Sequence, residues 1–557
     1  MRNKFAVPLI VLGVLLMLIG IGQRTIWAPP ETESVSAPAE AGNAVITVLD
    51  TELLAEHPDG VEITVRSEAP FTLAVGRAND VEAWVGEAAV NRLGAADGEL
   101  AVETENGEAQ TPNPAGSDLW VVEESGEGEL SYDWDAPESG EWEILLAADG
   151  TAPAPTDVTM TWENDATRPF AVPLIVVGAL LAVLGLALAF LRSGSDGPRR
   201  SGRRSSGTET GSGDRQHSVS GSTSAFTATA RRRPAFLAAA AAAVLAAGSA
   251  PAAALAAESD GGSLPVVGDA QLERILDSVA ATVGAGDAAK DASMLKPRVE
   301  GAAYAMREAN YAVAGKSGDQ EAPVPVAAEA LRTQSVSGAA GWPRTVVAVT
   351  QGDGNPVPQA LLLVQASARD NYKLVSAVQM LPASTFPQPP TGTGADQIPA
   401  DSDNGLVMSP QDAVSALADS LTAPDGENKD TFAANRFSED VVKFQQQVQG
   451  DPKNEHALNA FQHAADPAGT YALRTDDGGA VVFGYLSNTF SSTPKEAGDS
   501  INLEGTVYEA LTGQATTDKG IDVTHGEAVM LYVPASGSTG QAVVVGADQE
   551  LLSAKLK

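Results

Sequence analysis

The sequence contains no cysteine, and this absence excludes several kinds of chemistry. Without cysteine there is no disulfide, no thiolate nucleophile and no thiolate metal ligand. A lipid anchor attached to cysteine is excluded in the same way, so we expect anchoring to come from apolar spans. Lysine is also absent between residues 23 and 169, where 5 arginines stand against 31 acidic residues.

Recognisable catalytic motifs are missing as well. The chain has only 5 histidines and carries neither G-x-S-x-G nor H-E-x-x-H. Gly315-Lys-Ser317 resembles the end of a phosphate-binding loop, but Asn310 stands where the first glycine of that motif belongs. We therefore predict no catalytic residue and no bound cofactor.

Two stretches resemble metal sites and fall short of one. Residues 401–405 begin like a calcium loop, but Asp412 occupies the place of the terminal bidentate glutamate. His456 and His463 share a face if their stretch is helical, yet no third ligand is placed beside them. We interpret the first as a solvated acidic linker and the histidines as exposed helix residues, and we predict no metal ligand.

The net charge of −37 is unevenly distributed. Residues 192–233 hold 9 arginines against 3 acids, whereas residues 258–557 hold 19 basic and 38 acidic side chains. Short basic loops stay in the cytoplasm, so we expect the N-terminus and residues 192–233 inside and both acidic regions outside. Acidic exterior regions disfavour nucleic acid as a partner. Residues 192–233 should be disordered, and membrane lipid is an expected partner.

Two apolar stretches are long enough to cross a bilayer. Residues 5–22 and 170–191 contain no charged side chain, and we predict each to be a transmembrane helix. Gly13 and Gly20 recur as Gly178 and Gly185, which suggests that these glycines let the two spans pair closely. The alternative is that the two spans resemble each other only because apolar helices have similar compositions. Neither span holds an ionisable residue, which disfavours a transporter or channel.

A third apolar stretch, residues 235–257, has the layout of a secretory signal peptide inside the chain. Three arginines precede an alanine-rich core, which ends at Ala254-Leu-Ala256 followed by Ala257. Two outcomes are open: the stretch is a third transmembrane helix, or signal peptidase cuts after Ala256. In the second case the C-terminal part becomes a separate protein.

Between the first two spans, residues 41–166 carry short β-like runs separated by turn residues. Such runs occur at residues 61–65, 71–76, 81–85 and 141–146, and apolar and polar side chains clearly alternate at 61–65 and 141–146. Many short alternating runs are typical of an antiparallel β-sandwich. We therefore expect an extracytoplasmic, all-β sandwich domain close to the membrane.

The C-terminal 300 residues predict two related α+β modules, residues 267–382 and 407–557, joined by a proline-rich linker at 383–406. Each opens with an amphipathic helix and continues with strand-like runs. Ser409 and Pro410 form a helix start, with serine as N-cap and proline at the first helical position. The order of helices before antiparallel strands therefore occurs twice.

The stretch from Asn371 to Pro382, a final strand running into a proline-rich linker, carries a resemblance. It is similar to exported bacterial proteins with cystatin-like or nuclear-transport-factor-like folds. The whole arrangement resembles an uncharacterised family of bacterial multi-span membrane proteins. This resemblance implies a helix cradled by a curved antiparallel sheet in each half, and it brings no catalytic residues.

The sequence thus predicts a multi-domain membrane protein with a β-sandwich ectodomain and tandem helix-on-sheet modules. We expect a non-catalytic binding or scaffolding role at the cell envelope, with envelope proteins or polymer as partners. One alternative is a hydrolase of envelope polymer, which needs two carboxylates about 5–10 Å apart across a cleft. Another is an extracytoplasmic sensor that signals to residues 192–233. The sequence does not specify the oligomeric state.

Overall fold

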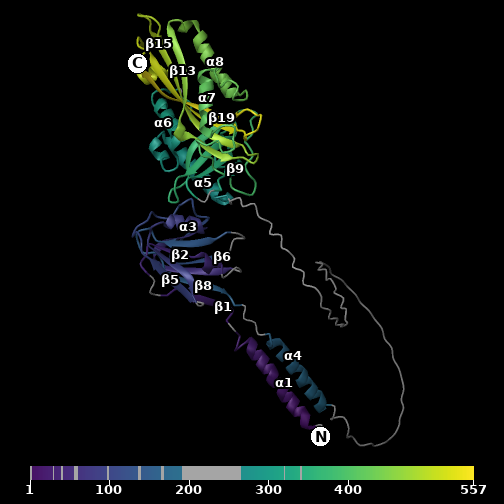
Figure 1. The fold of residues 1–557 in the computed structure, drawn as a ribbon. Coiled ribbons are helices and arrows are strands. Elements are labelled where there is room, and N and C mark those ends of the chain that lie inside the picture. The colour runs from purple at the N-terminus through teal and green to yellow at the C-terminus, as the bar shows by residue number, and fades with distance from the viewer. Residues whose placement is uncertain are drawn as a thin grey trace, which may run out of the picture. The chain divides into compact units, whose positions relative to one another are not determined.

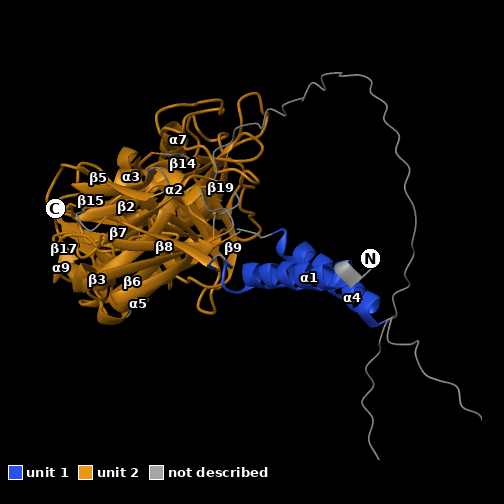
Figure 2. Cartoon of the chain, turned by 90° about the horizontal axis from the view of Figure 1, so that it is seen from below, with its two compact units in different colours: residues 1–30, 165–259 blue, residues 31–164, 260–557 orange. Residues whose placement is uncertain are grey.

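A computed structural model describes ten stretches of the chain. They are residues 3–28, 30–38, 42–55, 60–96, 99–135, 140–164, 169–190, 265–318, 320–338 and 341–557. The basic loop at 192–233, the apolar stretch at 235–257 and the predicted cleavage residues Ala254, Ala256 and Ala257 lie outside these residues. The described residues form two compact units, one within residues 3–30 and 169–190 and the other within residues 31–164 and 265–557 (Figure 2).

The first unit consists of two helices, α1 (Asn3–Arg24) and α4 (Ala171–Phe190). By length and composition, both are apolar enough to cross a membrane, each with a mean hydropathy of 2.7. Figure 1 shows the two helices side by side. These helices match the spans predicted at residues 5–22 and 170–191 within a few residues.

The four span glycines lie where α1 and α4 approach each other. A Cβ atom added to Gly13 would lie 2.5 Å from the carbonyl oxygen of Gly178, and one added to Gly178 would lie 2.6 Å from that of Gly13. Added to Gly20 it would lie 2.7 Å from the oxygen of Ala171, and added to Gly185 it would meet Ile10. The contacts run in opposite directions along the two helices, so the pair is antiparallel, and only glycine allows this spacing.

Residues 31–164 form a β-rich domain, called the β domain below (Figure 1). Its elements are β1 (Thr32–Ser36), β2 (Ile46–Leu49), α2 (Thr51–Ala55), β3 (Val61–Arg77), α3 (Ala78–Val85), β4 (Val90–Ala96), β5 (Glu99–Glu105), β6 (Val122–Trp134), β7 (Trp142–Ala147) and β8 (Asp157–Glu163). The eight strands are hydrogen-bonded in the order β1-β8-β3-β7-β2-β4-β5, and β6 also pairs with β3.

This sheet differs from the predicted antiparallel sandwich in two ways. All eight strands belong to one hydrogen-bonded sheet, because the long strand β3 shifts register between Ser67 and Phe71 and pairs with β8 before the shift and β7 after it. In addition, β2 pairs with β4 in parallel. The strand predicted at residues 81–85 is wrong: it belongs to α3, which buries Val81 and Trp84 on one helical face.

The C-terminal region, residues 265–557, contains two sets of helices, each followed by an antiparallel sheet. The first set comprises α5 (Asp269–Ala289), α6 (Gly301–Ala314), β9 (Leu331–Val336), β10 (Arg344–Thr350), β11 (Gln359–Gln365) and β12 (Lys373–Gln379). The second comprises α7 (Pro410–Thr422), α8 (Arg436–Gly450), β13 (Ala457–Ala465), β14 (Tyr471–Arg474), β15 (Ala480–Pro494), β16 (Ile501–Asn502), α9 (Val507–Thr512), β17 (Thr516–Thr517), β18 (Ile521–Val533) and β19 (Val543–Leu556). The sheet orders are β12-β11-β10-β9 and β13-β15-β18-β19.

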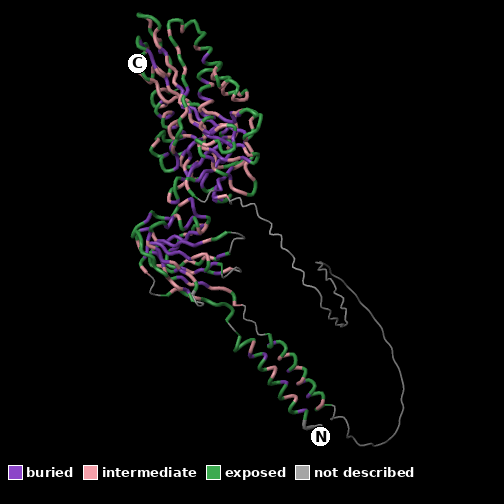
Figure 3. Tube along the Cα trace, in the orientation of Figure 1, coloured by how far each residue is buried: buried purple, intermediate pink, exposed green. Residues whose placement is uncertain are grey.

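The two sheets pack against each other, so the halves share a core and are not independent modules. On β10, Val346 packs in the cluster formed with α5 and α6, while Val347 belongs to a second cluster that also contains Phe483 of β15. On the far side of β15, Val482 packs against α7. Each sheet is thus covered by helices on its outer face, and the layers run helix, sheet, sheet, helix. Figure 3 shows the buried residues concentrated in these layers and in the β domain.

Local sequence features explain several of these elements. The Ser409 Oγ accepts a hydrogen bond from the Asp412 backbone at 3.1 Å, so the N-cap predicted for α7 is confirmed. The predicted linker at 383–406 is packed across both sheets, since Phe386 and Ala395 lie in the shared cluster and Ile398 in the cluster beside α7. It therefore belongs to the core of this region.

Candidate functional site

The β domain and the C-terminal region meet at a junction built around buried ion pairs. Asp118, in the loop before β6, accepts hydrogen bonds from both terminal nitrogens of Arg298, and Nη2 lies 3.0 Å from Oδ1. The backbone N–H of Tyr372 also donates to Asp118 Oδ2 at 2.8 Å. The Arg298 and Asp118 side chains are 10% and 8% exposed. Such a two-pronged, charge-assisted contact is among the stronger polar interactions in proteins.

A second ion pair crosses the same junction. Arg344, the first residue of β10, contacts the carboxylate of Asp80 from α3, and both side chains are almost completely buried. The Arg344 guanidinium also lies 4.0 Å from the centre of the Trp342 ring, a cation–π arrangement. In both pairs, the acid comes from the β domain and the arginine from the C-terminal region.

Backbone carbonyl oxygens of the β domain accept hydrogen bonds from further arginines of the C-terminal region. Arg369 donates to the Trp84 and Val85 oxygens, both at 2.8 Å, which satisfies carbonyls at the C-terminal end of α3. Arg274 donates to the Trp120 oxygen at 2.5 Å. Ala368 packs in the same apolar cluster as Trp84 and Trp120. The junction therefore combines opposite charges with apolar packing.

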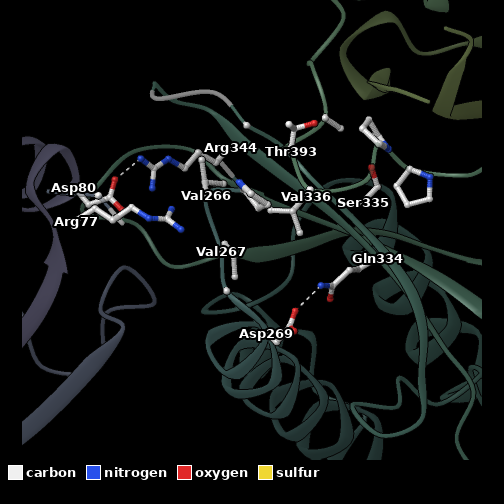
Figure 4. Close-up of a pocket in the computed structure, with 18 of the residues that line it drawn as sticks. Arg77, Asp80, Val266, Val267, Asp269, Gln334, Ser335, Val336, Arg344 and Thr393 are labelled. Atoms are coloured by element: carbon white, nitrogen blue, oxygen red, sulfur yellow. Dashed lines mark hydrogen bonds and ion pairs between the residues drawn. The ribbon is translucent and has the colours of Figure 1, made fainter. Parts of the chain in front are cut away.

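A cavity of about 700 Å³ lies beside the Asp80–Arg344 pair, with walls from both domains. Figure 4 shows Arg77, Asp80 and Arg344 at one end and Gln334 with Asp269 at the other. The Gln334 Nε2 donates to Asp269 Oδ1 at 2.8 Å. Val266, Val267 and Val336 form part of the wall between the two ends.

Arg77 gives this cavity an unusual electrostatic feature. Burial lowers the pKa of the Arg77 guanidinium, Asp80 opposes that change, and the charge of Arg344 adds to it. Asp80 is already engaged by Arg344. Among the described residues, the Arg77 guanidinium has no hydrogen-bonding or ion-pair partner, so a half-buried cation lines the cavity.

A second, smaller cleft of about 380 Å³ lies between the halves of the C-terminal region. It contains Asp548 and Glu550 of β19, which share one face of the strand. Burial raises the pKa of Asp548 to about 6 and also raises that of Glu550. Gln379 donates to both oxygens of Asp548 at 2.8 Å, and Asn310 and Gln320 donate to Glu550 at 3.2 and 3.0 Å. Amide groups of the first half of the C-terminal region thus hydrogen-bond to both acids of the second half.

The prediction of exposed helix histidines is wrong about the helix for both residues, and its exposure holds for His456 alone. His456 is exposed, but His463 lies on β13 with its side chain fully buried. Its Nδ1 is 3.0 Å from Glu527 Oε2, and its Nε2 is 3.3 Å from the amide nitrogen of Gln445. The prediction failed because α8 ends at Gly450, just before Pro452, so the stretch between the histidines is not helical.

Among the described residues, no three histidine, aspartate or glutamate side chains gather closely enough to hold a metal ion. The junction residues were missed at the sequence level, because each is a single charge without a motif. One local signal exists for Arg344: it directly precedes the apolar run of β10, where a cation is costly to bury without a partner.

Comparison with known proteins places the larger part of the chain in a family. Residues 263–556 match the family described as a domain of unknown function, DUF8094. The chain belongs to this family. The DUF8094 domain spans both helix-and-sheet halves of the C-terminal region, and it contributes the arginines of the junction. No solved structure matches the chain.

One curated relative of this DUF8094 protein is an uncharacterized lipoprotein of Streptomyces avermitilis. The two are 29% identical over 212 residues, which is 37% of this chain and 60% of the relative. The chain thus matches less than two thirds of the relative's length. Together with the N-terminal apolar helix, this relative suggests an uncharacterised family associated with membranes.

Proposed function

We propose that this protein is a non-catalytic, membrane-anchored scaffold of the cell envelope. In this proposal α1 and α4 span the membrane, and the β domain holds the DUF8094 domain outside the cytoplasm. The two apolar helices and the lipoprotein relative support membrane association. As parts of the same proposal, the β domain is an ectodomain, and each half of the DUF8094 domain resembles a cystatin-like fold.

The observation that carries this function is the junction itself. The apolar clusters of the β domain and those of the DUF8094 domain are separate, apart from Ala368 and Trp342 at the contact. Four charged side chains are nevertheless buried between them in two complementary pairs, Asp118–Arg298 and Asp80–Arg344. When the two domains separate, both charges of each pair are exposed to water. When one residue of a pair is removed in the docked state, the other charge stays buried without a partner, which costs about 3–5 kcal/mol. The contact is therefore specific.

The scaffold role is favoured over the envelope-polymer hydrolase because of how the carboxylates are held. Asp548 and Glu550 accept hydrogen bonds at all four oxygens, three from side-chain amides and one from the backbone N–H of Gln379. They also lie on one strand and do not face each other across a cleft, as a glycosidase pair would. Envelope proteins or polymer are the partners we propose. The sensor alternative depends on residues 192–233, which lie outside the described residues.

The test uses the full chain with a site-specific protease sequence inserted after Glu258. The protein is purified in detergent and cut, and the fragments are separated by size-exclusion chromatography. We expect both fragments to elute together, because the junction does not depend on the covalent connection. In the double variant Asp118→Ala and Arg344→Ala, we expect them to separate.

The matched control is the double variant Asp133→Ala and Arg436→Ala. Asp133 is exposed on the β domain, and Arg436 is 65% exposed and pairs with Asp440 of its own helix. These fragments should stay together. If the unmodified fragments separate after cutting at micromolar concentration, the scaffold proposal is wrong.

A further inference from the structure

We propose that the cavity at the domain junction binds a small amphipathic anion. Its carboxylate or phosphate would be held by Arg77, and its apolar part would lie against the valine wall. The inference goes beyond the scaffold role, and it rests on that role only because the cavity exists while the two domains are docked.

The size and walls of the cavity suit a small molecule. Its volume of about 700 Å³ falls within the range of roughly 300–1,000 Å³ that is typical of small-molecule sites. Val266 and Val336 contribute apolar surface from the DUF8094 domain, and Trp142 lines the cavity from the β domain. Sites of this kind are commonly found between domains, with a few polar groups that orient the ligand.

Arg77 is the group that selects an anion. It is the last residue of β3 and lines the cavity next to a second arginine, Arg344, whose charge is matched by Asp80 (Figure 4). A guanidinium presents five N–H donors in a fixed plane and fits a carboxylate or phosphate through two parallel hydrogen bonds. With no described partner for Arg77, that donor capacity is open to a ligand.

The Asp269 carboxylate at the other end of the cavity defines the rest of the ligand. It accepts a hydrogen bond from Gln334 Nε2 at 2.8 Å. A carboxylate has two oxygens and can accept further hydrogen bonds. This end of the cavity therefore suits an N–H or O–H donor on the ligand.

The acids of the cavity fix the direction in which such a ligand would lie. Asp269 is at the Gln334 end, so a second anionic group is disfavoured there. An anionic head at Arg77 and a hydrogen-bond donor near Gln334 describe an acylated amino acid or short peptide with a free carboxylate. A phosphate monoester with a hydroxyl or amide group shares the same chemistry.

The experiment is a titration of the purified full chain in detergent by calorimetry. The probes are N-acetyl-alanyl-alanine, the same dipeptide with a C-terminal amide, and 4-hydroxyphenyl phosphate. We expect heat of binding for the free acid, the phosphate or both, and at least tenfold weaker binding of the amide. The two anionic arms distinguish a carboxylate from a phosphate source.

The test variant is Arg77→Gln, which should weaken binding of the anion by about 10- to 100-fold. Arg77→Lys keeps the charge and should recover part of that loss. The control is Arg66→Gln, because Arg66 lies on the same strand but is 49% exposed and pairs with Glu129 at 2.7 Å. This control should bind like the unmodified chain.

Three results would overturn the proposal: none of the probes binds, the amide binds as well as the acid, or Arg77→Gln binds normally. The integrity of Arg77→Gln is checked by cutting after Glu258, since co-eluting fragments show an intact junction. Fragments of the unmodified chain that separate contradict the scaffold role. Fragments that stay together without binding a probe contradict only the ligand proposal.

Discussion

At the scale of single residues, Glu143 on β7 shows how burial sets the behaviour of a charge. The residue is 6% exposed, and its Oε2 has no hydrogen-bonding partner among the described residues. Burial raises the pKa of Glu143 from 4.5 to about 7, and the nearby carboxylate of Glu82 adds to the increase. The folded protein therefore holds this proton more tightly than the unfolded chain does.

The raised pKa predicts how stability changes with pH. The contribution of Glu143 to the free energy of unfolding is fully present below about pH 4.5, falls as the pH rises toward 7, and stays low above that. The reason is that, between these two pH values, the unfolded chain loses the proton while the folded protein keeps it. In Glu143→Gln this dependence should disappear, and at pH 8 the variant should unfold on the order of a few °C higher than the unmodified chain. Thermal unfolding from pH 4.5 to 8 measures the difference.

The control for this prediction is Glu141→Gln, which changes an exposed carboxylate just before the same strand. Its unfolding temperature should follow that of the unmodified chain at every pH. A Glu143→Gln variant that keeps the full pH dependence would show that Glu143 ionises normally in the folded protein.

At the scale of elements, the pair of α1 and α4 depends on glycine. Gly13 and Gly178 each bring a backbone oxygen within 2.5–2.6 Å of the place where a Cβ would stand on the other. We expect Gly178→Ile to push the helices apart. In the cysteine-free chain, cysteines placed at Ala6 and Ala182, both buried on the helix pair, can be bridged with a short bismaleimide. The yield of the bridge should fall severalfold in the Gly178→Ile background.

Leu180→Ile is the matched change on the same helix, because Leu180 is 65% exposed in the described structure and points away from the partner helix. It should leave the bridge unchanged. Equal bridging in both backgrounds would mean that the glycines do not set the distance between the two helices.

Elements with a local cause could be predicted from the sequence, and those with a distant cause could not. The face of α5 that carries Leu272 and Ile275 follows from helical spacing, and the start of α7 follows from Ser409. The strands of the shared core also appeared as apolar runs. The packing of the two sheets against each other could not be predicted. Strand β10 is apolar on both faces, and the sequence pattern does not show which element covers either face.

The same limit applies to the candidate site. Asp118 and Arg298 are 180 positions apart in the sequence, and each is one of many charges in an acidic chain. Only the fold brings them together. Arg77 ends a strand that the alternation predicted in two separate pieces, at residues 61–65 and 71–76, so its place at the junction could not be inferred.

At the scale of the whole molecule, the junction constrains the path of the chain. The β domain lies between α1 and α4 in the sequence, and the DUF8094 domain follows α4. Docking requires both domains on the same side of the membrane. If α4 crosses the bilayer, the chain has to return between residues 191 and 264. The apolar stretch at 235–257 is the segment whose composition suits that return, whether or not it is cut after Ala256.

Charge and docking together therefore predict one topology. Because the chain has no cysteine, single cysteines at Glu68, Thr539 and Ser205 report the β domain, the DUF8094 domain and the basic loop without background. A membrane-impermeant maleimide applied to intact cells should label the first two positions, which are exposed in the structure, and should label Ser205→Cys only after permeabilisation. Labelling at Glu68→Cys without labelling at Thr539→Cys would place the two domains on opposite sides of the membrane, where the junction of Asp118 and Arg298 could not form.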